Sequence, residues 1–366
     1  MSRFSNIGHR LYSGEVSYDF IGRRRRWYAI SAIILLVAIG GMLFRGLNLG
    51  IEFRGGADFT LPNATCTVEE ARSTANGFTG SQSIVTESAN GTVRVQTETL
   101  TPAESTQLAG QLADTCGVST EDIKVQVVGP TWGAEISQKA LQGLIVFIVL
   151  VALFLSIYFE WRMAVAALLA LAHDIVITIG IYALTGLEVT PATVIGLLTI
   201  LGYSLYDTVV VFDKVKENTR GIAGQSVMTY SEAANLAVNQ TVVRSINTSI
   251  VALLPVLAII IVGAGFLGAS TLLDLAVVLF IGMAAGTYSS IFFATPFLAQ
   301  LKEMQPDMKA LSARVAARRK AGRGVATESA GGEAPVPGSV TTGSLTRAES
   351  MARQQPKRQA RSKRKG

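Results

Sequence analysis

One carboxylate stands inside an apolar stretch that is long enough to cross a bilayer. Asp207 lies in the segment Gly202–Asn218, and the apolar run around it begins near Ala192 and ends at Asp213. At a helical rise of ~1.5 Å per residue, Asp207 is roughly 9 Å inside the boundary that Asp213 marks. A short carboxylate at that depth is costly unless it is paired, hydrated or protonated. The position favours a step in a proton or ion pathway, with a structural carboxylate as the alternative.

A cationic residue opens the next apolar run and could pair with that carboxylate. Asn247 and Thr248 follow Arg244 at i+3 and i+4, so the three residues form one polar stripe along a helix. An Arg beside an Asp favours the ionised carboxylate, and burial without the Arg favours the protonated one. A movement that separates Asp207 from Arg244 would therefore load a proton, and rejoining them would release it. A permanent ion pair, or an Arg that reaches lipid headgroups, is the alternative.

A second carboxylate lies near the middle of another apolar run. Asp174 and Thr178 are one helical turn apart, so both are expected to point into the protein. This placement fits a second proton-relay position or a hydrogen-bonded packing residue. His173 is adjacent in sequence, so it is expected to point elsewhere and to be structural.

Other chemistry has little support in the sequence. The chain contains 2 His and 2 Cys, and it shows no nucleophile–base set, no metal-ligand spacing and no phosphate-binding loop. We therefore expect no enzyme activity, no metal and no cofactor. The energy source is not expected to be ATP bound by this chain.

The elements that must position these residues are membrane-spanning helices. Of the 366 residues, 49% are hydrophobic and only 16% are charged, which is typical of a polytopic membrane protein. Six runs are long enough to cross ~30 Å of hydrocarbon. They are Trp27–Phe44, Leu141–Phe159, Met163–Ala183, Ala192–Phe212, Ile246–Phe266 and Leu272–Phe293.

The distribution of Lys and Arg predicts the orientation. Basic residues cluster before the first run, in alternate loops and after the last run, so the positive-inside rule places both termini in the cytoplasm of a cell-membrane protein. The predicted division is a cytoplasmic lead (1–26), a first span (27–46), an exterior domain (47–139), spans two to six (140–300) and a basic tail (301–366). The tail is expected to be disordered and to be attracted to anionic lipid. Contact with a ribosome or RNA is the alternative.

The exterior segment shows the pattern of a small α+β domain. Strands are expected over Ile51–Leu61, Ser83–Ser88, Thr92–Thr97 and Asp122–Val128. Thr67 and Thr101 are each followed by Glu three residues later, the signature of a capped helix start. The order βαββαβ predicts a ferredoxin-like domain, with a passive spacer as the alternative role.

Both cysteines, Cys66 and Cys116, fall in this exterior segment. A disulfide is chemically permitted outside the cytoplasm. Closing a loop of this length could stabilise the domain by roughly 4 kcal/mol. Two free thiols are the alternative.

Several sequence blocks together resemble the SecF branch of the SecD/SecF family, within the resistance-nodulation-division superfamily of proton-driven carriers. The resemblance covers residues 1–300. The blocks are YDFIGRRRRWYAIS from Tyr18, LGIEFRGG from Leu49, the segment Gly202–Asn218, NQTVVRSINTS from Asn239 and GTYSSI from Gly286. The family's functional Asp and Arg would fall on Asp207 and Arg244.

The resemblance implies a subunit of the Sec protein-export machinery. It implies SecD as the partner, next to the SecY–SecE–SecG channel and its motor SecA, and an unfolded exported polypeptide as the cargo. SecD and SecF would use the proton motive force to promote late translocation and release. A proton-driven exporter of small molecules or lipids from the same superfamily, or a non-transporting translocase scaffold, is the alternative.

Overall fold

The computed structural model describes residues 17–88, 91–262 and 270–330. The chain divides into two compact units, residues 1–316 and 317–366, and the description below concerns the first. Within the described residues, six helices are long and apolar enough to cross a membrane. They comprise α2 (Arg24–Phe44), α6 (Pro130–Tyr158), α7 (Trp161–Thr185), α8 (Pro191–Asn218), α9 (Tyr230–Val262) and α10 (Ser270–Ser289) with its continuation.

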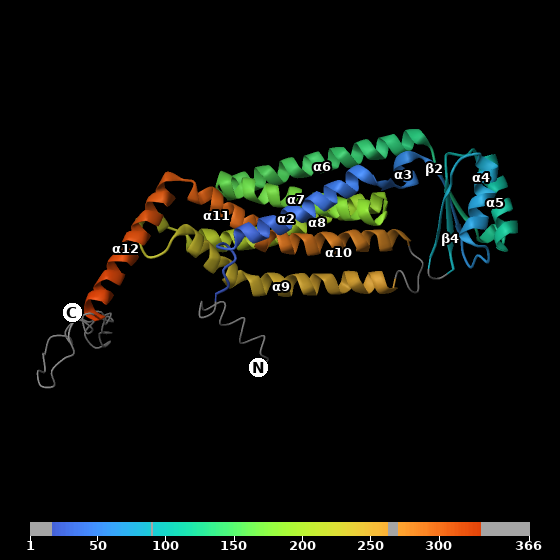
Figure 1. Cartoon of the computed structure of the whole chain (residues 1–366). Coiled ribbons are helices and arrows are strands. Elements are labelled where there is room, and N and C mark those ends of the chain that lie inside the picture. The colour runs from blue at the N-terminus through green and yellow to red at the C-terminus, as the bar shows by residue number, and fades with distance from the viewer. Residues whose placement is uncertain (1–16, 89–90, 263–269, 331–366) are drawn as a thin grey trace, which may run out of the picture. The chain divides into compact units, whose positions relative to one another are not determined.

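These helices lie alongside one another in a bundle (Figure 1). The six predicted spans are confirmed as helices, although the predicted end of the fifth, Phe266, falls outside the described residues. The last span is longer than predicted. It continues from α10 through a π-helix (Ser290–Ala294) into α11 (Thr295–Glu303).

Glycines set the spacing between the central helices α8 and α10. A Cβ built on Gly286 would lie 2.7 Å from the Cβ of Ser204, and one on Gly282 would lie 1.9 Å from the side chain of Ile200. Only a residue without a side chain permits this approach of two helices. The closeness brings the polar side chains of α8 within hydrogen-bonding distance of those on α10.

The segment between α2 and α6 contains a four-stranded antiparallel sheet. Its strands are β2 (Gly56–Leu61), β3 (Ile84–Glu87), β4 (Val93–Thr97) and β5 (Lys124–Val128), in the spatial order β3-β4-β2-β5. Helices α4 (Val68–Thr79) and α5 (Pro102–Cys116) cover one face (Figure 1). We call these six elements the sheet domain. Its core contains Phe59, Leu61, Leu108 and Leu112.

The helix starts of the sheet domain follow the predicted capping boxes. The Thr67 hydroxyl accepts from the Glu70 N–H, and the Glu70 carboxylate accepts from the Thr67 N–H at 2.8 Å. The same reciprocal pair forms at Thr101 and Glu104. Cys66 and Cys116 are joined by a disulfide, which ties the start of α4 to the end of α5.

The strand predicted over Ile51–Leu61 is wrong in its first half. Ile51–Arg54 forms a single helical turn, α3, and the strand begins at Gly56. Gly55 separates them with φ 78°, a conformation that favours glycine and breaks a strand. The Arg54 side chain also donates to the Leu49 carbonyl at 2.7 Å, which stabilises the turn.

Two further features at the ends of the bundle were not predicted from the sequence. A short parallel pair, β1 (Asn48–Leu49) with β6 (Glu188–Val189), joins the end of α2 to the α7–α8 connection. The segment 301–366 was expected to be disordered, but α12 (Pro306–Ala330) occupies its first part, and Leu311 is buried against the helices. Residues 331–366 fall outside the described residues.

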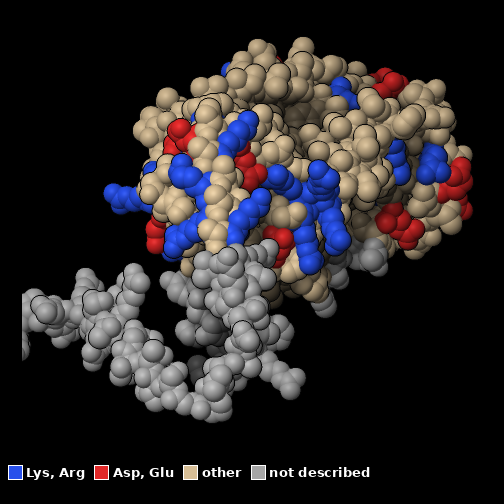
Figure 2. Space-filling view, turned by 60° about the vertical axis from the view of Figure 1, so that its left-hand side comes forward, with Lys and Arg blue, Asp and Glu red and all other residues tan. Residues whose placement is uncertain are grey.

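Lys and Arg side chains gather on the face of the molecule shown in Figure 2. Their positions in the chain, around the start of α2, at the start of α7, at the end of α8 and from the end of α11 onward, correspond to one end of the bundle. The sheet domain follows the opposite end of α2, so the charge pattern distinguishes the two ends.

Candidate functional site

The candidate site is a set of two buried carboxylates and the hydroxyl groups around them, between α7, α8, α9 and α10. Asp207 on α8 is only 6% exposed. The Ser245 hydroxyl on α9 donates to its Oδ1 at 2.6 Å. Its Oδ2 has no hydrogen-bond partner among the described residues. Asp207 therefore has one partner and one open oxygen inside an apolar bundle.

Arg244 does not pair with Asp207 in this structure. The Arg244 side chain is exposed, and its Nη2 donates to the Tyr206 hydroxyl at 3.4 Å. Ser245 follows it by one residue, which is a turn of about 100° around the helix, and it is Ser245 that faces Asp207. Arg244 instead borders a surface cavity of about 590 Å³ with Asp213 and Glu217.

The predicted polar stripe on α9 lies mostly on its exposed side. Asn247 is exposed and Thr248 is partly exposed, as their spacing from Arg244 requires. The buried polar face of α9 carries Ser245 and Ser249 instead. The spacing rule correctly grouped Arg244, Asn247 and Thr248, but it did not show which face of the helix turns inward.

Asp174 on α7 lies at the centre of a second hydrogen-bonded group. Its Oδ2 accepts from the Ser204 hydroxyl at 2.5 Å and from the Ser289 hydroxyl at 2.9 Å. The Thr178 hydroxyl donates to the Asp174 main-chain carbonyl at 2.8 Å, so it does not contact the carboxylate itself. Asp174 thus joins α7, α8 and α10.

The expectation that His173 points away from Asp174 is wrong. The His173 Nδ1 lies 3.2 Å from the Asp174 Oδ1, and both residues are buried. The imidazole stacks on Phe293 with ring centroids 4.8 Å apart. Side chains that are adjacent on a helix can come into contact when one of them turns toward the other. Stacking on the Phe293 ring favours this orientation of His173. Its Nε2 has no partner among the described residues.

Hydroxyl groups lie between the two carboxylate positions. Ser289, which donates to Asp174, is followed by Ser290, whose Oγ lies 3.3 Å from the hydroxyl of Thr208. Thr208 is the neighbour of Asp207 in sequence. A further pair, Ser249 and Thr287, lies 2.7 Å apart between α9 and α10. Side chains that can both donate and accept protons therefore line the interior from α7 to α9.

The π-helix positions two of these groups. Ser289 and Ser290 are at its start, and the Thr295 hydroxyl donates to the Ser290 carbonyl at 3.0 Å. Pro296 follows, and it has no N–H to give to the preceding turn. The wider turn accommodates this missing donor, and such π-turns are frequent at functional sites.

Within the described residues no group of three or more His, Cys, Asp or Glu could hold a metal ion. The groups that do gather here are two carboxylates, one imidazole and several hydroxyls. Groups of these kinds can accept, donate and relay protons.

Comparison with known proteins identifies the family. The family model "Protein export membrane protein SecD/SecF, C-terminal" matches residues 108–304, and the "SecD/SecF GG Motif" matches residues 40–62. The protein translocase subunit SecF of Streptomyces coelicolor is 53% identical over 336 residues, which cover 91% of this chain and 90% of the relative. The chain belongs to the SecD/SecF family. The Mycobacterium tuberculosis SecF is 44% identical over 350 residues, covering 90% of this chain and 79% of that one.

Solved SecD/SecF structures share the fold. The crystal structure of SecDF from Thermus thermophilus, described as a translocon-associated membrane protein, superposes with a TM-score of 0.71 at 32% identity. The match covers 79% of this chain and 39% of that one. The relatives named SecF are protein translocase subunits, so this chain is a SecF-type, multi-pass membrane member of the SecD/SecF family with a role in protein transport.

Sequence reasoning missed the serines of the site. Ser204, Ser245, Ser289 and Ser290 all lie in the sequence blocks that suggested the SecD/SecF family, and each interrupts an apolar run. A hydroxyl in a helix can satisfy itself on its own backbone, so a lone Ser gives no strong signal. The signal that could have found them is their repetition on three adjacent spans.

A separate polar cluster joins the sheet domain to the bundle. The Arg94 guanidinium on β4 donates to Asp58 Oδ2 and to Glu188 Oε2, each at 2.5 Å. Gln96 donates to Asp58 at 3.1 Å and to Glu188 at 2.7 Å. Burial raises the pKa of Asp58, although Arg94 and Gln96 act to lower it. Glu188 comes from the α7–α8 connection, so these contacts join two parts of the fold.

Proposed function

We propose that this chain is the SecF-type subunit that, with SecD, uses the proton motive force to promote late translocation and release of exported proteins. The observation that carries the proposal is Asp207, buried among membrane helices with one hydroxyl partner and one unpartnered oxygen. Ionisable groups in such places mark proton pathways in pumps and carriers. Asp174, which is separated from Asp207 by hydroxyl-bearing residues, is the second proposed position of the proton.

Arg244 supplies the second half of the proposed switch. It lies on α9 one residue before Ser245, the present partner of Asp207. A rotation or sliding of α9 would exchange the Ser245 hydroxyl for the Arg244 guanidinium. The approach of Arg244 favours the ionised carboxylate and its departure favours protonation. Asn247 and Thr248, which share the face of Arg244, would turn toward α8 in the same movement.

The energy available fits such a switch. Moving one proton through the membrane potential supplies ~2.3 kcal/mol per 100 mV. Shifting a balanced two-state equilibrium about tenfold requires ~1.4 kcal/mol. One proton for each movement of α9 is therefore sufficient to bias the helix between two positions.

The proposed partners follow from the relatives. SecDF of Thermus thermophilus carries its SecF-like part in a longer chain, which supports a SecD subunit as the neighbour of this one. The SecY–SecE–SecG channel with SecA would deliver an unfolded polypeptide, which the sheet domain would contact on the far side of the membrane. The strand order β3-β4-β2-β5 with two helices on one face supports a ferredoxin-like fold for this domain.

The proposed orientation has both termini in the cytoplasm. It rests on the Lys and Arg residues at the end of the bundle opposite the sheet domain (Figure 2). In this division, residues 1–26 and 301–366 are cytoplasmic, and the domain between the first two spans, 47–139, is exterior. The relatives' names describe transport, which supports a role without catalysis.

The test replaces Asp207 with Asn in cells whose only copy of this chain carries the change. Asn keeps the size and can still accept from Ser245, but it cannot carry a proton. We expect maturation of a pulse-labelled exported protein to slow about tenfold or more, with normal levels of the variant in the membrane. Asp307→Asn, at an exposed position on α12, is the matched control and should leave export unchanged.

Export at the normal rate in Asp207→Asn cells would contradict the proton role and favour a scaffold. A homodimer without SecD, seen by native electrophoresis of the wild-type membranes, would instead favour an exporter of small molecules or lipids.

A further inference from the structure

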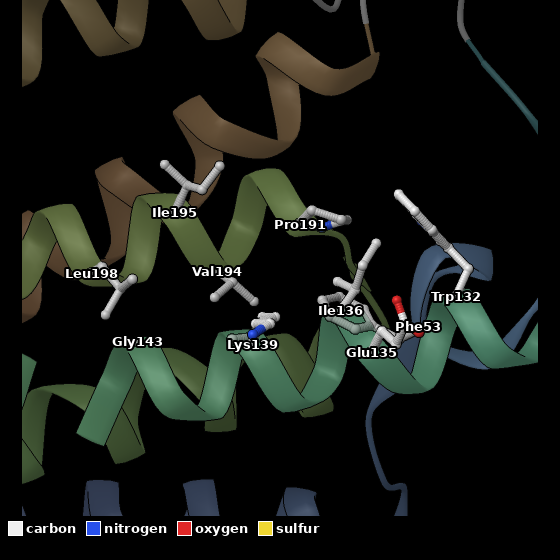
Figure 3. Close-up of a pocket in the computed structure, with 11 residues that line it drawn as sticks. Phe53, Trp132, Glu135, Ile136, Lys139, Gly143, Pro191, Val194, Ile195 and Leu198 are labelled. Carbon is white, nitrogen blue, oxygen red and sulfur yellow. The ribbon is translucent and has the colours of Figure 1, made fainter. Parts of the chain in front are cut away.

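An apolar groove runs between α6 and α8 near the sheet domain (Figure 3). It encloses about 340 Å³ and is lined by Ile136 and Gly143 of α6 and by Val194 and Leu198 of α8. A second cavity of about 420 Å³ shares some of the same residues and continues to Leu144. Volumes of this size are typical of small-molecule sites.

Two opposite charges stand at the mouth of this otherwise apolar groove. Glu135 and Lys139 both line it, one helical turn apart on α6 (Figure 3). Neither forms an ion pair with another described residue. At ~1.5 Å per residue, Lys139 lies roughly 6 Å farther along the helix from the sheet domain than Glu135. A Lys next to the hydrocarbon region requires an anionic partner or contact with water.

The order of groups along α6 matches one kind of lipid. Starting from the sheet domain, the helix presents Trp132, Glu135, Lys139 and then the groove-lining residues Ala140, Gly143 and Leu144. A phospholipid with an amine headgroup presents, in the same direction, an ammonium group, a phosphate and its acyl chains. Trp132 is 59% exposed, and tryptophan is enriched at the membrane interface where such headgroups lie.

The width of the groove favours a lipid acyl chain, rather than a protein helix, as its occupant. A Cβ built on Gly143 would lie 4.0 Å from the Leu198 side chain, so α6 and α8 are almost in contact there. A protein helix is about 10–12 Å across and would not enter. An acyl chain is narrow enough to lie in the groove above this contact, along Val194 and Leu198.

We propose that this groove binds one zwitterionic phospholipid of the phosphatidylethanolamine type. Its ammonium group contacts Glu135, its phosphate contacts Lys139, and one acyl chain lies along Val194 and Leu198. Phe53 of α3 also lines the groove, so the lipid contacts the segment that leads into the sheet domain. The lipid would thereby fill the groove between α6, α8 and the start of that domain. The inference does not depend on the proton role of Asp207.

The test is native mass spectrometry of the full-length chain, released from detergent after incubation with phosphatidylethanolamine, phosphatidylglycerol or phosphatidylcholine. We expect one retained phosphatidylethanolamine per chain. Lys139→Gln should weaken retention about tenfold, the usual effect of losing one charge-assisted hydrogen bond. Glu135→Gln should remove the preference over phosphatidylglycerol, since it removes the partner of the ammonium group.

Two further variants separate binding from structural damage. Lys124→Gln removes an exposed lysine on β5 and should retain lipid like the wild type. Gly143→Leu fills the floor of the groove and should reduce retention of every lipid. Equal retention by the wild type, Lys139→Gln and Gly143→Leu would overturn the proposal. So would a wild-type preference for phosphatidylglycerol, or cross-links in membranes from Trp132 to another protein subunit in place of lipid.

Discussion

At the scale of single residues, the buried carboxylates differ in how completely their oxygens are satisfied. The Asp174 Oδ2 accepts two hydroxyls, whereas the Asp207 Oδ2 has no partner in the described part of the chain. A carboxylate held by groups on two other helices resists movement, and a carboxylate with an open oxygen can change partners. The two serines therefore fix the position of Asp174 within the proposed proton pathway, whereas Asp207 is free to change its partner.

The fixed position of Asp174 can be tested with its two serine partners. Ser204→Ala or Ser289→Ala should each lower the free energy of unfolding by about 1–3 kcal/mol, because each removes a donor to a buried carboxylate. The double variant should lose more unfolding free energy than the two single variants together, since the Asp174 Oδ2 then has no donor. Unfolding of the purified chain in detergent measures this, and Ser156→Ala on the exposed side of α6 is the control. Losses equal to the control would show that Asp174 does not depend on these hydroxyls.

Glu52 on α3 gives a prediction about pH. Burial raises the pKa of its carboxyl group above the usual 4.5, and Glu188 and Asp58 raise it further, while its own backbone N–H and Arg94 lower it. A carboxyl whose pKa is higher in the folded state destabilises that state when it is ionised. The cost is absent below the unfolded pKa and grows as pH rises through the folded one.

Glu52→Gln should therefore stabilise the chain at pH 7, with a gain that shrinks as pH falls toward 4.5. Denaturant unfolding of the purified chain at several pH values measures the difference. Glu87→Gln, at an exposed position on β3, is the control and should show no such trend. A gain that stays constant with pH would contradict this origin.

At the scale of the helices and strands, the close contact of α8 with α10 depends on glycine. Gly286→Ala would place a methyl group 2.7 Å from the Ser204 Cβ, and the helices would have to separate. We expect a loss of about 1–3 kcal/mol, the usual cost of overpacking. Gly202→Ala is the matched control, because no atom lies within 4 Å of its added methyl group. Thermal unfolding in detergent compares the two variants. Equal stability would mean that α10 can move away from α8 without loss of folding free energy.

The sequence predicted which helices and strands exist better than it predicted which side of each helix is buried. Apolar length alone predicted six spans, and Thr67 and Thr101 predicted both capped helix starts, because these signals are local. The facing of α9 was not predictable, since both of its sides carry polar residues and only packing decides between Ser245 and Arg244. The break at Gly55 was missed for the same reason. A glycine pair fits both a bulged strand and a turn, and contact with the rest of the fold selects one.

At the scale of the whole molecule, the sheet domain and the helices are joined by charge and by backbone pairing. Arg94 lies between Asp58 of its own sheet and Glu188 of the α7–α8 connection, and β1 pairs with β6 beside them. The connection that carries Glu188 leads directly into α8, the helix of Asp207. A shift of α8 would therefore move Glu188 and change its ion pair with Arg94. This gives a physical route from the proposed proton site to the sheet domain.

Replacing Glu188 tests whether a movement of α8 reaches the sheet domain through this ion pair. In Glu188→Gln the Arg94 side chain retains Asp58, so the sheet should stay folded while its link to the helices weakens. Hydrogen exchange should quicken about tenfold at the paired amides of β1 and β6, and remain unchanged in the β2–β4 ladder. Export should slow although Asp207 is intact. Slower export with unchanged exchange would place the effect of Glu188 elsewhere. Faster exchange with normal export would show that the sheet domain is not driven through this junction.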